Sequence, residues 1–186
     1  TQVVSNGYHV DFEYVRDNIG FQAYGGSLKG SMGTQVEGSG NSLDRAFLLH
    51  RLLRAKGFKP QIALGRLRGA NLEKVLALSQ GIEPGEEGLN LDMVSREKLT
   101  NILQDHYWVQ LPVSDGKWLD LDPTFTDAVP GKTIAGLRKQ LKRVPRHLFQ
   151  RIEIKVFADF SIGRNKATSQ LIRYIGLTKD LMTEPV

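Results

Sequence analysis

The stretch GNSLDRAFLLHRLLRAKG, from Gly40 to Gly57, decides the fold of this 186-residue chain. It predicts a helix from Ser42 to Lys56, with apolar residues on most of its circumference. Gly57 follows in the position that favours a left-handed C-terminal cap. A helix that is apolar on most sides must be buried, so we expect this helix at the centre of the protein.

Three later segments predict the strands that this helix packs on. Pro60–Leu67 and His106–Val113 alternate apolar and polar residues, and Trp118–Leu121 continues the second segment after the turn Ser114-Asp-Gly-Lys117. The Asp122-Pro-Thr sequence ends the last strand. The expected fold class is α+β, with a central buried helix packed on an antiparallel β-sheet.

The rest of the chain predicts peripheral elements and one insertion. We expect helices at Val10–Ile19 (apolar at Val10, Tyr14, Val15 and Ile19), Ala70–Gln80, Asp92–Gln104, Thr133–Leu141 and Thr168–Leu181, a strand at Phe149–Phe160, and loops at Phe21–Gly40 and Gly81–Leu89. Residues 1–186 are expected to form one domain with a core at about 10–125 and a helical insertion at about 70–104, which is long for a connection between core strands. Residues 146–186 either complete the sheet or begin an adjoining module, with a seam near Pro145.

The composition limits the class of protein. A hydrophobic fraction of 40% and a charged fraction of 24% are typical of a soluble globular protein, and no apolar run approaches the roughly 20 residues of a membrane span. The start Thr1-Gln-Val-Val shows no leader and no initiator Met, so we expect a processed protein or an excised piece, and we assign no compartment from it. The chain has no cysteine, which excludes disulfides and thiolate chemistry. His9, His50 and His147 have no partners at ligand spacing, so we expect neither a metal nor a cofactor.

The net charge of +5 is unevenly spread. Residues 132–173 hold eleven Lys or Arg against Glu153 and Asp159, a local charge of +9 that could attract an acidic partner. A solvated surface is nevertheless the favoured interpretation, and no nucleic acid is expected. The sequence leaves the oligomeric state open.

Three polar residues lie where acyl-transfer chemistry would need them. Ser42 opens the central helix, whose backbone amides and dipole favour a developing negative charge. His106 begins a strand and can carry a proton, and Asp122 at the end of the adjoining strand can orient it. Each residue also has a plain structural interpretation; Ser42, followed by Asp44, is a common helix N-cap pattern.

These segments, in this order, resemble the core of the transglutaminase-like superfamily, which has a papain-like fold, over about Val10–Phe125. The family helix opens with Gly-x-Cys, so the resemblance places the catalytic Cys at Ser42, the catalytic His at His106 and the catalytic Asp at Asp122. A closer resemblance is to a bacterial subgroup of large, often multidomain, secreted or surface proteins. In that subgroup a Tyr-Gly-Gly-Ser-Leu-Lys-Gly segment, here Tyr24–Gly30, precedes Gly-Asn-x-x-Asp-x-Ala, and the Cys position often holds another residue.

The resemblance implies a secreted or cell-surface protein whose partner is a protein or peptide bearing glutamine or another amide. Three interpretations stay open: a non-catalytic binding module, a Cys-to-Ser inactivated form of a thiol acyltransferase or peptidase, and a serine acyl hydrolase. For an oxyanion, the backbone amide of Ser42 is the first candidate donor, the side chains of Tyr24 and Trp108 are weaker ones, and Gln35 is weaker still.

Overall fold

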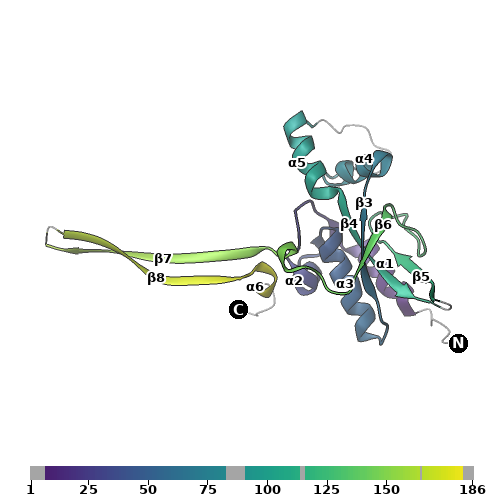
Figure 1. Ribbon diagram of the computed structural model, residues 1–186, viewed down its shortest axis with the longest axis horizontal. Helices are drawn as coiled ribbons and strands as arrows, with labels where there is room; N and C mark the ends of the chain where they lie inside the picture. Colours follow the sequence, from purple (N-terminus) through teal and green to yellow (C-terminus); the bar gives the residue numbers. More distant parts are fainter. Residues whose placement is uncertain (1–6, 83–90, 114–115, 164, 182–186) are drawn as a thin grey trace.

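The computed structural model describes residues 7–82, 91–113, 116–163 and 165–181, which form a mixed α+β body and a long two-stranded arm (Figure 1). The body sheet is antiparallel, with the strand order β5-β4-β3-β6. Its strands are β3 (Gln61–Arg66), β4 (Asp105–Pro112), β5 (Trp118–Leu121) and β6 (Gly136–Leu141). Strands β3, β4 and β5 lie where the sequence predicts them, and the α+β class is confirmed.

The central helix is α3 (Ser42–Ala55), which packs on one face of the sheet together with α1 (Gly7–Asn18). Its apolar side chains are buried on most sides, as predicted: Leu43, Ala46, Leu48, Leu49 and Leu53. Helix α1 presents Phe12 and Val15 to this core, whereas Val10 is exposed. The prediction for this helix is therefore correct in place but wrong in assigning Val10 to its buried face.

The two helices predicted in the insertion are present as α4 (Gly69–Leu78) and α5 (Met93–Leu103). They lie together beyond one end of β3 and β4 (Figure 1). Val75, Leu76 and Leu103 pack around Trp108 in a second buried cluster. Residues 83–89 of the loop predicted at Gly81–Leu89, and residues 114–115 of the turn predicted between β4 and β5, lie outside the described residues.

The segment Thr133–Leu141, predicted as a helix, instead contains strand β6, which pairs with β3. The pairing needs Gly65 on β3, because a Cβ there would lie 2.6 Å from the carbonyl oxygen of Gly136 and 2.9 Å from Cβ of Ala135. Pairing with the open edge of β3 therefore outweighs the helical propensity of residues 133–141, because local propensity is weak in comparison with sheet pairing.

The glycine-rich segment Phe21–Gly40, predicted as a loop, contains helix α2 (Gly30–Glu37). Strands β1 (Gly20–Phe21) and β2 (Ser39–Gly40) flank it and pair in parallel. The Thr34 hydroxyl donates to the Gly30 carbonyl at 2.6 Å, and the buried Lys29 ammonium pairs with Glu37 at 2.6 Å. These contacts and the packing against α3 stabilise α2, although its glycines lower the helix propensity of the isolated segment.

The arm consists of β7 (Arg151–Ile162) and β8 (Asn165–Leu177), followed by the short helix α6 (Thr178–Leu181). Strand β7 confirms the strand predicted at Phe149–Phe160, but the helix predicted at Thr168–Leu181 is wrong except for its last turn. Residues 165–177 instead form strand β8, which pairs with β7 along its length. Within the described residues these two strands form a sheet of their own, so residues 146–163 and 165–181 do not complete the body sheet.

None of the helices in the described ranges is long and apolar enough to cross a membrane.

The position of Leu49 in the central helix generates a first prediction. Leu49→Ala should lower the free energy of unfolding by about 2 to 5 kcal/mol, because its side chain is fully buried and the surrounding core can relax only in part. Urea denaturation followed by tryptophan fluorescence measures the change. Val36→Ala on the exposed side of α2 is the control and should change the value by less than about 0.5 kcal/mol. Equal effects of the two substitutions would contradict a central role for α3.

Candidate functional site

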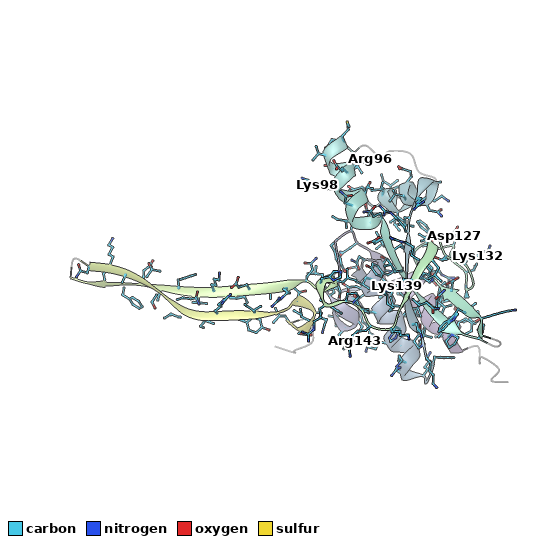
Figure 2. The ribbon with its side chains drawn as sticks, viewed as in Figure 1. Arg96, Lys98, Asp127, Lys132, Lys139 and Arg143 are labelled. Carbon is cyan, nitrogen blue, oxygen red and sulfur yellow. The ribbon has the colours of Figure 1, made fainter. Side chains whose placement is uncertain are left out.

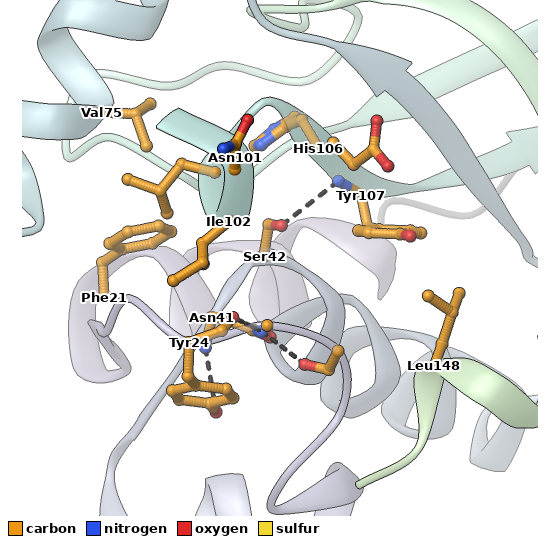
Figure 3. A pocket seen from close by; sticks show the side chains of 14 residues that line it. Phe21, Tyr24, Asn41, Ser42, Val75, Asn101, Ile102, His106, Tyr107 and Leu148 are labelled. Atoms are coloured by element: carbon orange, nitrogen blue, oxygen red, sulfur yellow. Dashed lines mark hydrogen bonds between the residues drawn. The ribbon is translucent and has the colours of Figure 1, made fainter. Parts of the chain in front are cut away.

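Ser42 is the first residue of α3, and its side chain is partly exposed. The N-cap is Asn41, whose side-chain oxygen accepts from the Asp44 amide at 2.9 Å. The interpretation of Ser42 as the cap is therefore wrong by one residue. Because Asn41 serves as the cap, the Ser42 hydroxyl is not used for capping and faces the sheet, where its Oγ accepts a long hydrogen bond of 3.4 Å from the Tyr107 amide (Figure 3).

His106 and Asp122 lie on the same face of the sheet because side chains alternate along a strand. In β4, His106 shares its face with Trp108, and in β5 the face of Asp120 continues to Asp122 just beyond the strand end. Nε2 of His106 lies 2.9 Å from Oδ2 of Asp122, with both side chains 1% exposed. The structure therefore joins the imidazole and the carboxylate that the sequence singles out, and it leaves Nδ1 as the ring nitrogen not used by Asp122.

The Asp122 carboxylate is held by several donors besides His106. They are the hydroxyls of Thr124 (2.6 Å) and Thr133 (2.9 Å) and the backbone amides of Thr124 (3.3 Å) and Ile134 (3.2 Å). Burial acts to raise the pKa of Asp122, but the charge of His106 and the hydrogen bonds outweigh burial and lower it to about 2. Asp122 is therefore ionised at neutral pH and fixes the orientation of the imidazole.

A buried cation from the central helix lies near this carboxylate. The guanidinium of Arg45 donates to the carbonyl oxygens of Pro123 (2.7 Å), Val15 (3.1 Å) and Thr124 (3.3 Å). Burial lowers the pKa of Arg45 to about 10, which leaves it charged at neutral pH. Arg45 thus ties the segment after Asp122 to α3 and α1 and partly compensates the buried negative charge.

A second buried carboxylate, Asp44, organises the loop in front of Ser42. It is 0% exposed and accepts five hydrogen bonds from this loop. The donors are the hydroxyls of Tyr24 (2.8 Å) and Ser27 (2.5 Å) and the amides of Leu28 (3.0 Å), Lys29 (2.9 Å) and Gly30 (3.1 Å). The Tyr24–Gly30 segment is therefore wrapped around the start of α3.

The side chains expected as oxyanion donors have other partners. The Tyr24 hydroxyl donates to Asp44 and accepts from the Asn41 amide at 3.1 Å, and burial together with the Asp44 charge raises the pKa of Tyr24. The Trp108 indole donates to Asp120 at 2.7 Å, and Gln35, whose carbonyl accepts from Arg51, does not line the pocket at Ser42. The backbone amide of Ser42, which as the first helical residue has no acceptor one turn earlier, is the donor that this geometry leaves.

A pocket of about 210 Å³ opens at Ser42 and His106 (Figure 3). Tyr24, Gly25 and Gly26 of the loop line one wall, and Val75, Asn101 and Ile102 of the insertion line another. Leu148, just before the arm, also reaches the pocket. Its size and mixed lining suit a side chain or a short peptide segment rather than a large ligand.

A second cavity of about 390 Å³ lies on the other side of Asp122, lined in part by Thr133, Phe125 and Lys132.

Sequence reasoning finds neither Thr133 nor Arg45 as part of the site. Arg45 binds backbone carbonyls 78 and 79 residues away, and such contacts leave no local pattern.

The basic stretch at residues 132–173 does not gather at the pocket. Lys132, Lys139 and Arg143 are spread over the body in Figure 2, and further basic residues lie on the arm, where Arg173 pairs with Glu153 at 2.7 Å. Over the described ranges, no group of three or more His, Asp or Glu side chains is arranged to hold a metal ion.

Comparisons with models of protein families, with curated proteins and with solved structures find no match for this chain.

The five hydrogen bonds to Asp44 lead to a stability prediction. Asp44→Asn should lower the free energy of unfolding by about 3 kcal/mol or more, because an amide turns an NH2 group toward buried donors. Asp92→Asn is the matched control: Asp92 caps α5 at the surface, where Asn is an equally good cap. Urea denaturation of both variants checks this. A loss at Asp44 no larger than at Asp92 would contradict the role assigned to its carboxylate.

The lowered pKa of Asp122 leads to a prediction on pH. A carboxylate with a depressed native pKa stabilises the fold above its unfolded pKa of about 3.9, and this contribution is lost as the pH falls toward 2. We expect the unfolding free energy of the native chain to fall between pH 4 and 2 by about 2 kcal/mol more than that of Asp122→Asn. Urea denaturation at several pH values measures the difference. Asp127→Asn, an exposed residue of the same loop, should behave like the native chain.

Proposed function

We propose that this chain is a transglutaminase-like domain with a papain-like core, and that it binds an amide-bearing peptide or protein segment at the Ser42 pocket without turning it over. One observation carries the proposal: the His106–Asp122 pair, 2.9 Å apart and buried, adjoins a helix start that offers a hydroxyl instead of a thiol. The pocket walls from the Tyr24–Gly30 loop and the insertion supply both apolar and amide groups for a peptide.

The chemistry of the hydroxyl supports binding rather than turnover. A thiol has a pKa near 8.5, which a helix N-terminus and an imidazolium can lower, so that a thiolate rests beside the histidine. A serine hydroxyl cannot rest in that form. In the described part of the chain, the contacts of Ser42 Oγ include the Tyr107 amide but no hydrogen bond to His106, whereas an activated serine normally contacts its base.

A second candidate function is thiol acyl transfer by a parent protein that has Cys at position 42. The detailed support of Asp122, with four hydrogen bonds besides that of His106, favours this candidate because it orients the imidazole as such a reaction needs. In that reaction the thiolate attacks a glutamine or peptide amide and forms a thioester. The nitrogen leaves with the proton carried by His106, and an amine or water then resolves the thioester.

Replacement of the hydroxyl tests both candidates. Ser42→Cys introduces the one thiol of the chain, so we expect iodoacetamide to label it with an apparent pKa below 8.5 and a glutaminyl peptide to acylate it. Intact-mass spectrometry detects both products. His106→Ala in the same background should slow acylation by about a thousandfold or more. Absence of acylation by any glutaminyl or peptide amide would remove the second candidate.

The native chain distinguishes binding from hydrolysis. We expect no labelling of Ser42 by a fluorophosphonate probe. In nuclear magnetic resonance titrations with a glutaminyl peptide, shifts should appear at Ser42, Asn101 and Ile102 and should be retained in His106→Ala. A peptide with Glu in place of Gln is the control. Fluorophosphonate labelling that Ser42→Ala abolishes would overturn the binding proposal in favour of a serine acyl hydrolase.

A further inference from the structure

The arm has one continuous uncharged face. Directly opposed residues of an antiparallel pair lie on the same side of the sheet, so the register of β7 and β8 separates two sets of side chains. One set, here called the apolar face, is Ile152, Ile154, Val156, Ala158, Phe160, Ala167, Ser169, Ile172, Tyr174 and Gly176. It contains no charged residue. Its large members Ile154, Val156, Phe160, Ile172 and Tyr174 are 40% to 55% exposed.

The opposite side of the arm has the character of a solvent-facing surface. It includes Glu153, which pairs with Arg173 at 2.7 Å and Lys155 at 3.4 Å, and Asp159, which accepts from Thr168 at 2.6 Å. Phe157, Ile175 and Leu177 also lie on this side, without removing its charges. Alternation of apolar and polar residues along the strands is typical of a sheet that is buried on one face and exposed to water on the other. The apolar face is thus the side that requires a cover.

The arm also presents this face in a fixed direction. At its base, the Gln150 amide donates to the Ser27 carbonyl at 2.8 Å, and the Ser27 amide donates to the Leu148 carbonyl at 2.5 Å. Phe149 stacks on Phe47 of α3 with ring centroids 5.7 Å apart. Beyond this anchor the arm projects clear of the body (Figures 1 and 2). A two-stranded sheet standing alone in water is marginal, so the projecting part needs a partner to persist.

We propose that the apolar face is an association surface that stacks on the same face of a second copy of this chain, giving a two-layer, four-stranded sandwich. Because the face carries no charge, two copies can meet without like-charge repulsion, as a two-fold interface requires. The Tyr174 ring fills the space above Gly176 that a side chain would otherwise occupy. With antiparallel arms, the two bodies lie at opposite ends of the stack.

The area of the apolar face sets the expected strength of the dimer. The twelve residues of β7, each paired with β8 and rising about 3.4 Å, give the two strands a footprint of about 40 by 12 Å. Two copies would bury on the order of 1,000 Å² in total, at the low end for specific interfaces. The expected dimer is therefore weak and depends on concentration.

Sedimentation equilibrium of the 186-residue chain from about 1 µM to 1 mM tests the proposal. We expect a monomer–dimer equilibrium that Ile172→Lys weakens more than about tenfold. Gln170→Lys is the matched control: it adds the same charge to the same strand, but the irregularity at Leu171 places it on the opposite side, so dimerisation should persist. Val156→Lys, from the facing strand, should repeat the effect of Ile172→Lys.

Trp108 and Trp118 both lie in the body, so their fluorescence shows whether each variant keeps the body folded independently of the arm. A monomer throughout the concentration range would overturn the proposal, as would equal weakening by Ile172→Lys and Gln170→Lys. Co-sedimentation of a monomeric chain with phosphatidylcholine–phosphatidylglycerol vesicles would overturn it in favour of a lipid surface.

Discussion

One wall of the Ser42 pocket depends on the hydrogen bonds that the buried carboxylate of Asp44 accepts. Asp44 lies in the first turn of α3, where the helix dipole favours negative charge, and five donors from the Tyr24–Gly30 segment converge on it. A buried charge of this kind is tolerable only when it is fully hydrogen-bonded. The carboxylate therefore holds a glycine-rich loop, with little tendency to form regular structure, against the helix as one wall of the pocket.

The next residue of the same helix, Arg45, holds the segment that follows Asp122. Arg45 points to the other side of α3 and binds the carbonyls that follow Asp122, so consecutive side chains connect the helix to both halves of the site. Asn41 caps the helix and leaves Ser42 facing the pocket. Asn41, Asp44 and Arg45 thus position the hydroxyl, the loop and the segment after Asp122, and a shift of α3 by one residue would separate all three.

The sequence predicted the parts of the fold that depend on local periodicity and failed where distant pairing decides. Helix α3 and strands β3, β4 and β5 follow from their own patterns, and the alternation along β4 and β5 places His106 and Asp122 on one face. Strand β6 exists because the edge of β3 is open to it, and β8 because β7 precedes it, so neither is apparent from a window of ten residues. For the same reason Thr133 and Arg45, whose partners lie far along the chain or in backbone, were not foreseen.

The His106–Asp122 pair has a structural reason to be present that does not depend on any chemistry. Asp122 also accepts hydrogen bonds from the hydroxyls of Thr124 and Thr133 and from the Ile134 amide, and its charge interacts with the buried charge of Arg45. Loss of its carboxylate would leave those donors and a buried cation without compensation, which is among the costliest changes a core can undergo. Exchange of a thiol for a hydroxyl at Ser42, by contrast, disturbs one partly exposed side chain. The proposed absence of a nucleophile is therefore compatible with the presence of Asp122, whose carboxylate the core requires in any case.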